Sequence, residues 1–408
     1  MSDRGAARPP GRGALPAWMR AGIVLLAAVV GFAVVGGALI VRDARMDDRF
    51  DIARWQRTAL ANKWLWHVGA PFRDDPSADE ALERYFTADD RNSPEALALR
   101  PAVEAAIEGR IDAVVREMGL NARGIRVPGS VFPPVNIQLV SPPRVLVESP
   151  REVIRRERTV LLRPDLAGRD IVRIEEEAEA RHPDRAALVV GVGGLATYPA
   201  IVNAHRTYET TVATAAHEWA HHYLVFYPLG YRYFTSLETQ VINETVADVI
   251  GDEVGRLVLE RWGDPTRPDD EPTPEPEAAE AELDEALDDE PEAAEAFDYL
   301  AALRSLRLEV DDLLEQGRVG DAERRMEEVR QEMIDHGFHF RRINQAFFAW
   351  FGTYAGRPDS VDPLGEQLDE IRERAGSLPD FVRLIQGMST RDEVEDLLAD
   401  LRALAATR

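Results

Sequence analysis

Two histidines separated by three residues stand in the middle of a predicted helix, in the sequence His217-Glu218-Trp219-Ala220-His221. Residues four apart share one face of a helix, with about 5–6 Å between their Cβ atoms. Both imidazoles can therefore reach one metal ion, and Glu218 can hold and deprotonate a water bound to that ion. A zinc hydrolase site needs three protein ligands and one open position, so the rest of the chain has to supply a third ligand.

The next predicted helix, residues 235–261, offers that ligand. The chain has no cysteine, so the third ligand has to be His, Asp or Glu. Glu244 is the best placed of these, 23 residues after His221. Asp248 lies one helical turn further on the same face, where it can accept the free N–H of a ligating histidine. We therefore predict one Zn²⁺ per chain, bound by His217, His221 and Glu244, with Asp248 orienting a histidine.

An H-E-x-x-H helix followed by a helix with E-x-x-x-D resembles the gluzincin group of zinc metallopeptidases, which includes thermolysin-like proteases and the large aminopeptidases. The resemblance covers about residues 208–252. It implies zinc on the two histidines and Glu244, and Glu218 as the general base that then passes a proton to the leaving amine. Elementary chemistry agrees, because zinc lowers the pKa of bound water towards about 7 and a neighbouring carboxylate can take its proton.

The resemblance also implies a downstream tyrosine or histidine that stabilises the oxyanion. Tyr354 is the first candidate, with His336 and His339 as alternatives, and all three have a purely structural interpretation as well. His222 is not expected to bind the metal. It directly follows His221 and therefore points about 100° away around the helix.

Upstream of the two helices, short apolar or β-branched runs separated by proline pairs predict strands. They lie at 135–140, 144–148, 159–162 and 187–192, with a helix at 165–181. The gluzincin resemblance implies an edge strand that pairs with an extended peptide substrate. In this chain that strand and its turn correspond to Val190, Gly191, Gly193 and Gly194.

The N-terminal part of the chain predicts a membrane anchor. Residues 1–20 read as a flexible cytoplasmic tail, and residues 21–41 contain no charge. That run spans roughly 31 Å as a helix, enough for a bilayer core. A cleaved signal peptide and a buried core helix are the alternatives. We expect a single-pass protein of the cell membrane with its catalytic domain outside the cytoplasm.

Charge is distributed unevenly along the chain. The formal net charge is −25, and residues 264–296 hold fifteen Asp or Glu against one Arg. Such a run of like charges with several prolines predicts a solvated, disordered insertion. A chain this acidic is not expected to bind nucleic acid, which requires a basic surface.

Together these patterns predict an α+β fold: an N-terminal transmembrane helix, a small mixed β-sheet before two active-site helices, and a mainly helical C-terminal region. The expected divisions are a tail (1–20), a transmembrane helix (21–41), a membrane-proximal helical segment (42–130), a catalytic core (131–263), an acidic insertion (264–296) and a helical region that completes the cleft (297–408).

The leading functional hypothesis is a membrane-anchored zinc metallopeptidase acting on a peptide or protein substrate. An alternative is a catalytically inactive, membrane-tethered metal-binding or scaffolding protein that retains the zinc site. A third is a zinc hydrolase acting on an ester or an epoxide. If the enzyme is an aminopeptidase, Glu209 and Asp184 are candidate anchors for the substrate amine.

Overall fold

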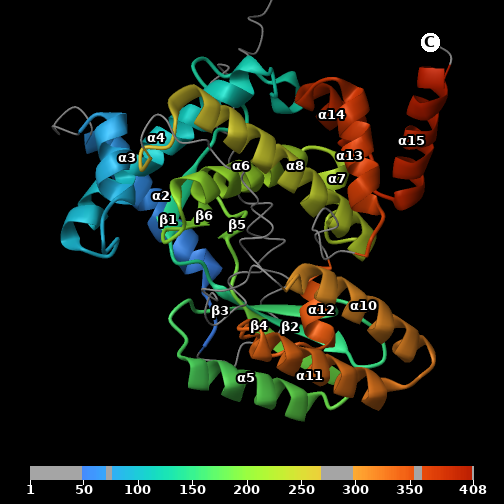
Figure 1. The fold of residues 1–408 in the computed structure, drawn as a ribbon. Coiled ribbons are helices and arrows are strands. Elements are labelled where there is room, and N and C mark those ends of the chain that lie inside the picture. Colours follow the sequence, from blue (N-terminus) through green and yellow to red (C-terminus); the bar gives the residue numbers. More distant parts are fainter. Residues whose placement is uncertain (1–47, 70–75, 268–296, 353–360, 407–408) are drawn as a thin grey trace, which may run out of the picture.

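The structure is a computed structural model that describes residues 48–69, 76–267, 297–352 and 361–406. The predicted tail at 1–20 and nearly all of the acidic insertion lie outside these residues. Figure 1 shows the arrangement of the described elements, in which helices surround two small sheets.

The transmembrane helix in the expected fold class needs a correction. Among the residues that the structure describes, no helix is both long enough and apolar enough to cross a membrane. The segment 21–41, to which that helix was assigned, lies outside the described ranges. The described residues form an α+β fold with no spanning helix among them.

The first sheet is mixed and leads directly into the helices of the candidate site. Strand β1 (Ile137–Val140) pairs in parallel with β6 (Ala200–Asn203), and β6 pairs antiparallel with β5 (Gly194–Leu195). Helix α6 (Tyr208–Leu224) follows β6 and packs against it, and α8 (Leu237–Trp262) packs against α6 (Figure 1). These two helices are the ones predicted around residues 207–226 and 235–261.

Helix α6 is the central element of this part of the molecule. Apart from Thr210 and His221, every one of its residues is buried. A helix that is covered on all sides belongs in the interior of a protein rather than on its surface. Thr207 caps its N-terminus by accepting a hydrogen bond from the Thr210 N–H. Trp219 anchors it further, because its indole N–H donates to the Pro133 carbonyl at 2.9 Å.

Two glycines of α8 allow the close packing of α6 and α8. A Cβ atom built on Gly251 would lie 2.9 Å from the Ala213 carbonyl oxygen and 3.0 Å from the Cβ of His217. A Cβ on Gly255 would lie 3.2 Å from the Cα of Ala213. Contacts this short leave no room for larger side chains, so the glycines set the separation at which residues of α8 face His217.

The remaining helices around this core come from both ends of the described chain. They share one hydrophobic cluster with α6 and α8. They are α3 (Ala78–Phe86), α4 (Pro94–Glu117), α7 (Pro228–Tyr231), α13 (Leu364–Ala375), α14 (Leu378–Ile385) and α15 (Arg391–Ala406). A 3₁₀ turn, η2 (Ala122–Gly124), contributes to the same cluster. Helix α2 (Ile52–Gly69) lies alongside α4.

The structure contains a second sheet, whereas the sequence predicted only one. Strands β2 (Arg144–Pro150), β3 (Arg158–Leu162) and β4 (Arg185–Val190) pair antiparallel in the order β3-β2-β4. The chain changes sheet after β1 because Pro142 and Pro143 have no N–H with which to continue a strand ladder.

Helices cover both faces of the second sheet (Figure 1). Val145 and Val147 point into one cluster, with α10 (Tyr299–Glu315), α11 (Val319–Asp335) and α12 (Gln345–Phe351). Leu146, between them, points into another cluster with α5 (Gly168–Arg181). The aromatic side chains of α12 are part of the first of these clusters and therefore pack in the core.

Pairs of glutamates close two of the four sheet edges. Glu104 and Glu108 of α4 accept the backbone N–H groups of Leu139 and Ile137 on β1, each at 2.8 Å. Four residues of helix rise about 6 Å and two residues of strand about 6.6 Å, so such a pair matches alternate N–H groups of a strand. Lys63 of α2 provides one positive charge shared by this pair, at 3.0 Å from Glu104 and 2.5 Å from Glu108.

The second sheet is closed in the same way. Glu175 and Glu179 of α5 accept the N–H groups of Val189 and Ala187 on β4, at 2.7 and 3.2 Å. On the opposite edge of this sheet, the Phe50 N–H donates to the Leu161 carbonyl of β3 at 3.1 Å. The outer edges of β1, β3 and β4 are therefore occupied, which leaves β5 as the edge to consider.

Candidate metal centre

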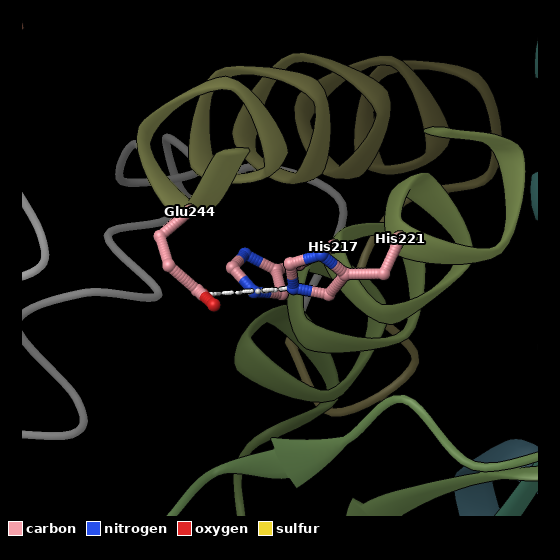
Figure 2. Close-up of side chains that lie close together, drawn as sticks. All are labelled: His217, His221 and Glu244. Atoms are coloured by element: carbon pink, nitrogen blue, oxygen red, sulfur yellow. Dashed lines mark hydrogen bonds and ion pairs between the residues drawn. The ribbon is translucent and has the colours of Figure 1, made fainter. Parts of the chain in front are cut away.

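Three side chains converge between α6 and α8. Nε2 of His217 and Nε2 of His221 lie 3.0 Å apart, and each is 3.6 Å from Oε2 of Glu244. Figure 2 shows both imidazole rings turned towards the Glu244 carboxylate. Two atoms bound to one zinc ion lie at most about 4 Å apart, because each bond is about 2.0–2.2 Å long. This buried group can therefore hold one metal ion.

The other nitrogen of each histidine is held by an acceptor on α8. Nδ1 of His217 donates to Oδ1 of Asp248 at 2.8 Å, and Nδ1 of His221 donates to Oδ1 of Asn243 at 2.7 Å. The amide of Asn243 is itself fixed, because its Nδ2 donates to the Leu229 carbonyl at 3.0 Å. Both rings therefore carry their proton on Nδ1 and present the Nε2 lone pair to the centre.

The electrostatics of the group favour a cation at that centre. Burial alone would lower the pKa of His217, but hydrogen bonds to Asp248 and Glu244 outweigh it and raise that pKa well above its usual range. Burial would raise the pKa of Glu244, yet the charge of His221 and its hydrogen bonds to the two histidines keep that pKa well below normal. Two facing nitrogen lone pairs 3.0 Å apart are stable only with a proton or a metal ion between them.

The Glu218 carboxylate lies against strand β5, and its charge interacts with those of His217 and His221. Burial raises the pKa of this carboxyl to about 7, against the opposing charges of His217 and His221. A Cβ atom built on Gly194 would lie only 2.3 Å from Oε1 of Glu218. The carboxylate therefore lies directly against the backbone of the β5 edge strand.

Tyr233 is part of the centre, although the sequence pattern did not identify it. Its hydroxyl donates to Oε1 of Glu244, and its ring meets that of His221 edge-on, with 6.2 Å between centroids. Burial and the Glu244 charge raise the Tyr233 pKa. Its position in the sequence is a signal for this role. Tyr233 lies in the segment that joins the two ligand-bearing helices, and such a segment has to pass close to the site.

His222 faces away from the metal cluster, as its position in the helix predicts. Its Nε2 donates to the Thr197 carbonyl at 2.7 Å, and its ring contacts Tyr198 edge-on. Burial lowers its pKa to about 4, so the ring is neutral near pH 7. It supports the turn between β5 and β6 and lies outside the group of His217, His221 and Glu244.

The four residues expected at the substrate edge strand are separated in the structure. Val190 is the last residue of β4, pairs with Val145 and belongs to the second sheet. Gly191 and Gly193 lie in the connection between the sheets, and Gly194 begins β5. Of the four, only Gly194 lies against Glu218, so the strand beside the site is β5 rather than the strand predicted at 187–192.

Neither His336 nor His339 joins the cluster. Tyr354 lies outside the described residues. His336 stacks on Phe297 at the end of α11, with 4.1 Å between the ring centroids, and His339 follows in the next connection.

Neither candidate amine anchor faces the centre. Glu209 stands in the first turn of α6, two turns before the ligands, and forms an ion pair with Arg267 at 3.5 Å. Asp184 is exposed in the turn before β4, on the second sheet. The geometry therefore gives no support to an amine anchor at either residue.

We compared the chain with protein-family models, with curated proteins and with solved structures, and none of them matched.

Proposed function

We propose that this protein is a zinc metallopeptidase in which Glu218 activates a water molecule for attack on a peptide bond. One observation carries the proposal: Nε2 of both histidines and Oε2 of Glu244 converge on one point, while the Glu218 carboxylate, one residue from His217, lies against an edge strand. The resemblance of these helices to the gluzincin pattern supports the same proposal.

Zinc is the metal that the ligand set favours. Two imidazoles and one carboxylate, with no thiolate, form a set typical of catalytic zinc sites with an open position for water. The proposed site would hold one ion between His217, His221 and Glu244. When bound there, zinc would lower the pKa of a water ligand and polarise a substrate carbonyl.

Glu218 has the properties of the base that such a reaction needs. Its pKa is raised to about 7, near the working pH at which a general base or acid is most effective. It would take a proton on its carboxylate from the attacking water and give that proton to the leaving amine. Its burial excludes bulk water from this exchange.

The edge of β5 is suited to an extended peptide. The Asn203 N–H donates to the Gly193 carbonyl at 2.9 Å, so the alternation of an antiparallel ladder directs the N–H and C=O of Gly194 away from β6. A substrate strand bound there by β-augmentation would pass beside Glu218.

The test combines metal analysis with digestion of a peptide library by the full chain. We expect about one zinc per chain and cleavage that disappears in Glu218→Gln while the zinc remains bound. Glu176→Gln, an exposed glutamate on α5, is the matched control and should cleave normally. Bound zinc with no cleavage of any peptide by the wild type would favour the inactive metal-binding protein instead.

A further inference from the structure

The two oxygens of Glu244 have different partners. Oε2 faces the two histidines at 3.6 Å each, whereas Oε1 accepts the hydroxyl proton of Tyr233. The tyrosine thus occupies the oxygen that would otherwise also be available to a metal ion. A carboxylate held in this way presents a single oxygen to the centre.

Arg156 reaches the same tyrosine from the second sheet. It lies in the connection between β2 and β3, and its guanidinium is close enough to the Tyr233 hydroxyl to oppose the rise in the pKa of that group. It also donates to Gln240, which stands four residues before Glu244 on α8. Its planar group lies 5.3 Å from the ring centre of Trp350 on α12, which fixes its position.

These contacts form one continuous chain. The Arg156 guanidinium lies near the Tyr233 hydroxyl, and that hydroxyl donates to Oε1 of Glu244. A cationic donor polarises the hydroxyl and strengthens the hydrogen bond that the hydroxyl makes. All three groups come from different elements: the β2–β3 connection, the α7–α8 loop and α8.

We propose that Tyr233 and Arg156 are positioning residues that hold Glu244 as a one-oxygen metal ligand, so that the β2–β3 connection contributes, through Arg156, to the metal affinity of the centre. This inference rests on the metal site of the proposed function and not on peptidase activity. Partners of this kind around a ligand typically change metal affinity by about 10–100-fold when they are lost.

The experiment measures metal binding directly. Zinc affinity is determined by competition with a chromophoric chelator, and the coordination of the centre by the visible absorption of the Co²⁺-loaded protein. We expect Tyr233→Phe to weaken zinc binding by about 10–100-fold and to change the Co²⁺ spectrum, because Oε1 of Glu244 becomes free to bind. Arg156→Gln should weaken binding by less, and the double variant should be no weaker than Tyr233→Phe.

Matched controls come from neighbouring residues. Tyr231→Phe changes an exposed tyrosine at the end of α7, two residues before Tyr233, and Arg155→Gln changes the exposed arginine next to Arg156. Both should bind zinc like the wild type. Chemical unfolding of each metal-free variant shows whether a loss of affinity reflects the centre or the fold.

Three results would overturn the inference. The first is a Tyr233→Phe variant that binds zinc within about twofold of the wild type and has an unchanged Co²⁺ spectrum. The second is a double variant whose loss is the product of the two single losses, which would mean that Arg156 does not act through Tyr233. The third is a wild-type protein that binds no metal, and this result alone would also remove the proposed function.

Discussion

Gly194 and Glu218 are in direct contact: a single methyl group added to Gly194 would come within 2.3 Å of the Glu218 carboxylate oxygen. The contact joins the outer strand of the first sheet to the proposed catalytic base. Because Gly194 has no side chain, the backbone of β5 and the carboxylate can lie side by side, where a substrate strand and an attacking water would have to meet.

The first prediction concerns this contact. Gly194→Ala should displace the Glu218 carboxylate and lower kcat/KM by about 100-fold, since a shift of about 1 Å in a catalytic group can have an effect of that size. Zinc content should stay at one per chain, because Glu218 is not a ligand. Gly168→Ala, where the added methyl meets nothing within 4 Å, is the control. Unchanged activity in Gly194→Ala would show that Glu218 does not act from its observed position.

The second prediction concerns the acceptors that orient the histidines. Asp248→Ala and Asn243→Ala each remove the partner of an Nδ1–H group, so each should weaken zinc binding by about 10–100-fold. Chelator competition measures the effect. Glu260→Gln on the exposed side of α8 should bind zinc normally. Equal affinity in all three variants would contradict the assigned orientation of the rings.

The third prediction tests the close packing of α6 and α8. Gly251→Ala places a methyl group 2.9 Å from the Ala213 carbonyl and 3.0 Å from the Cβ of His217, so the helices must separate. We expect a loss of about 1–3 kcal/mol in the free energy of unfolding, together with weaker zinc binding.

Gly109→Ala is the control for this third prediction, because it changes an exposed glycine inside α4 with nothing within 4 Å. It should stabilise the protein by about 0.5–1 kcal/mol. Urea unfolding of the metal-free proteins checks both values. A Gly251→Ala variant as stable as Gly109→Ala would mean that the two helices are not held at this separation.

The fourth prediction concerns the only lysine of the chain, Lys63, and its pH dependence. Burial raises the pKa of Glu104 and of Glu108, and the Lys63 charge partly offsets this in both. Burial alone would lower the pKa of Lys63, but the charges of Glu108 and Glu104 raise it above its usual value. The stabilisation by Lys63 is therefore complete below its unfolded pKa and is lost only as the pH rises through the higher folded pKa.

Lys63→Met leaves two buried carboxylates without a counter-charge, which should cost about 3–5 kcal/mol at pH 8. A carboxyl whose folded pKa is raised above its unfolded value binds protons more tightly in the folded state, so its contribution improves as the pH falls. The deficit should therefore be smaller at pH 5 than at pH 8 in urea unfolding. Arg57→Met, an exposed cation on α2, should show no such difference. A deficit that does not change with pH would contradict the buried charge pairing.

The sequence alone predicted the features that depend on local periodicity. The spacing of His217 and His221, and of Glu244 and Asp248, puts each pair on one face of a helix whatever the rest of the chain does. The helices that carry them form where the pattern indicated. The predicted grouping of the two histidines with Glu244 is present in the structure as a cluster that can hold a metal ion.

Only the tertiary structure decided which distant segments complete the centre. Strand pairing depends on which apolar faces meet, so the sequence could not show that residues 187–190 would join a second sheet while Gly194 reached Glu218. Tyr233 and Arg156 belong to loops, whose positions are fixed by the elements they connect and not by any periodic pattern. Helical spacing is a local property of the chain, whereas the partners of Glu218 and Glu244 result from packing between segments far apart in sequence.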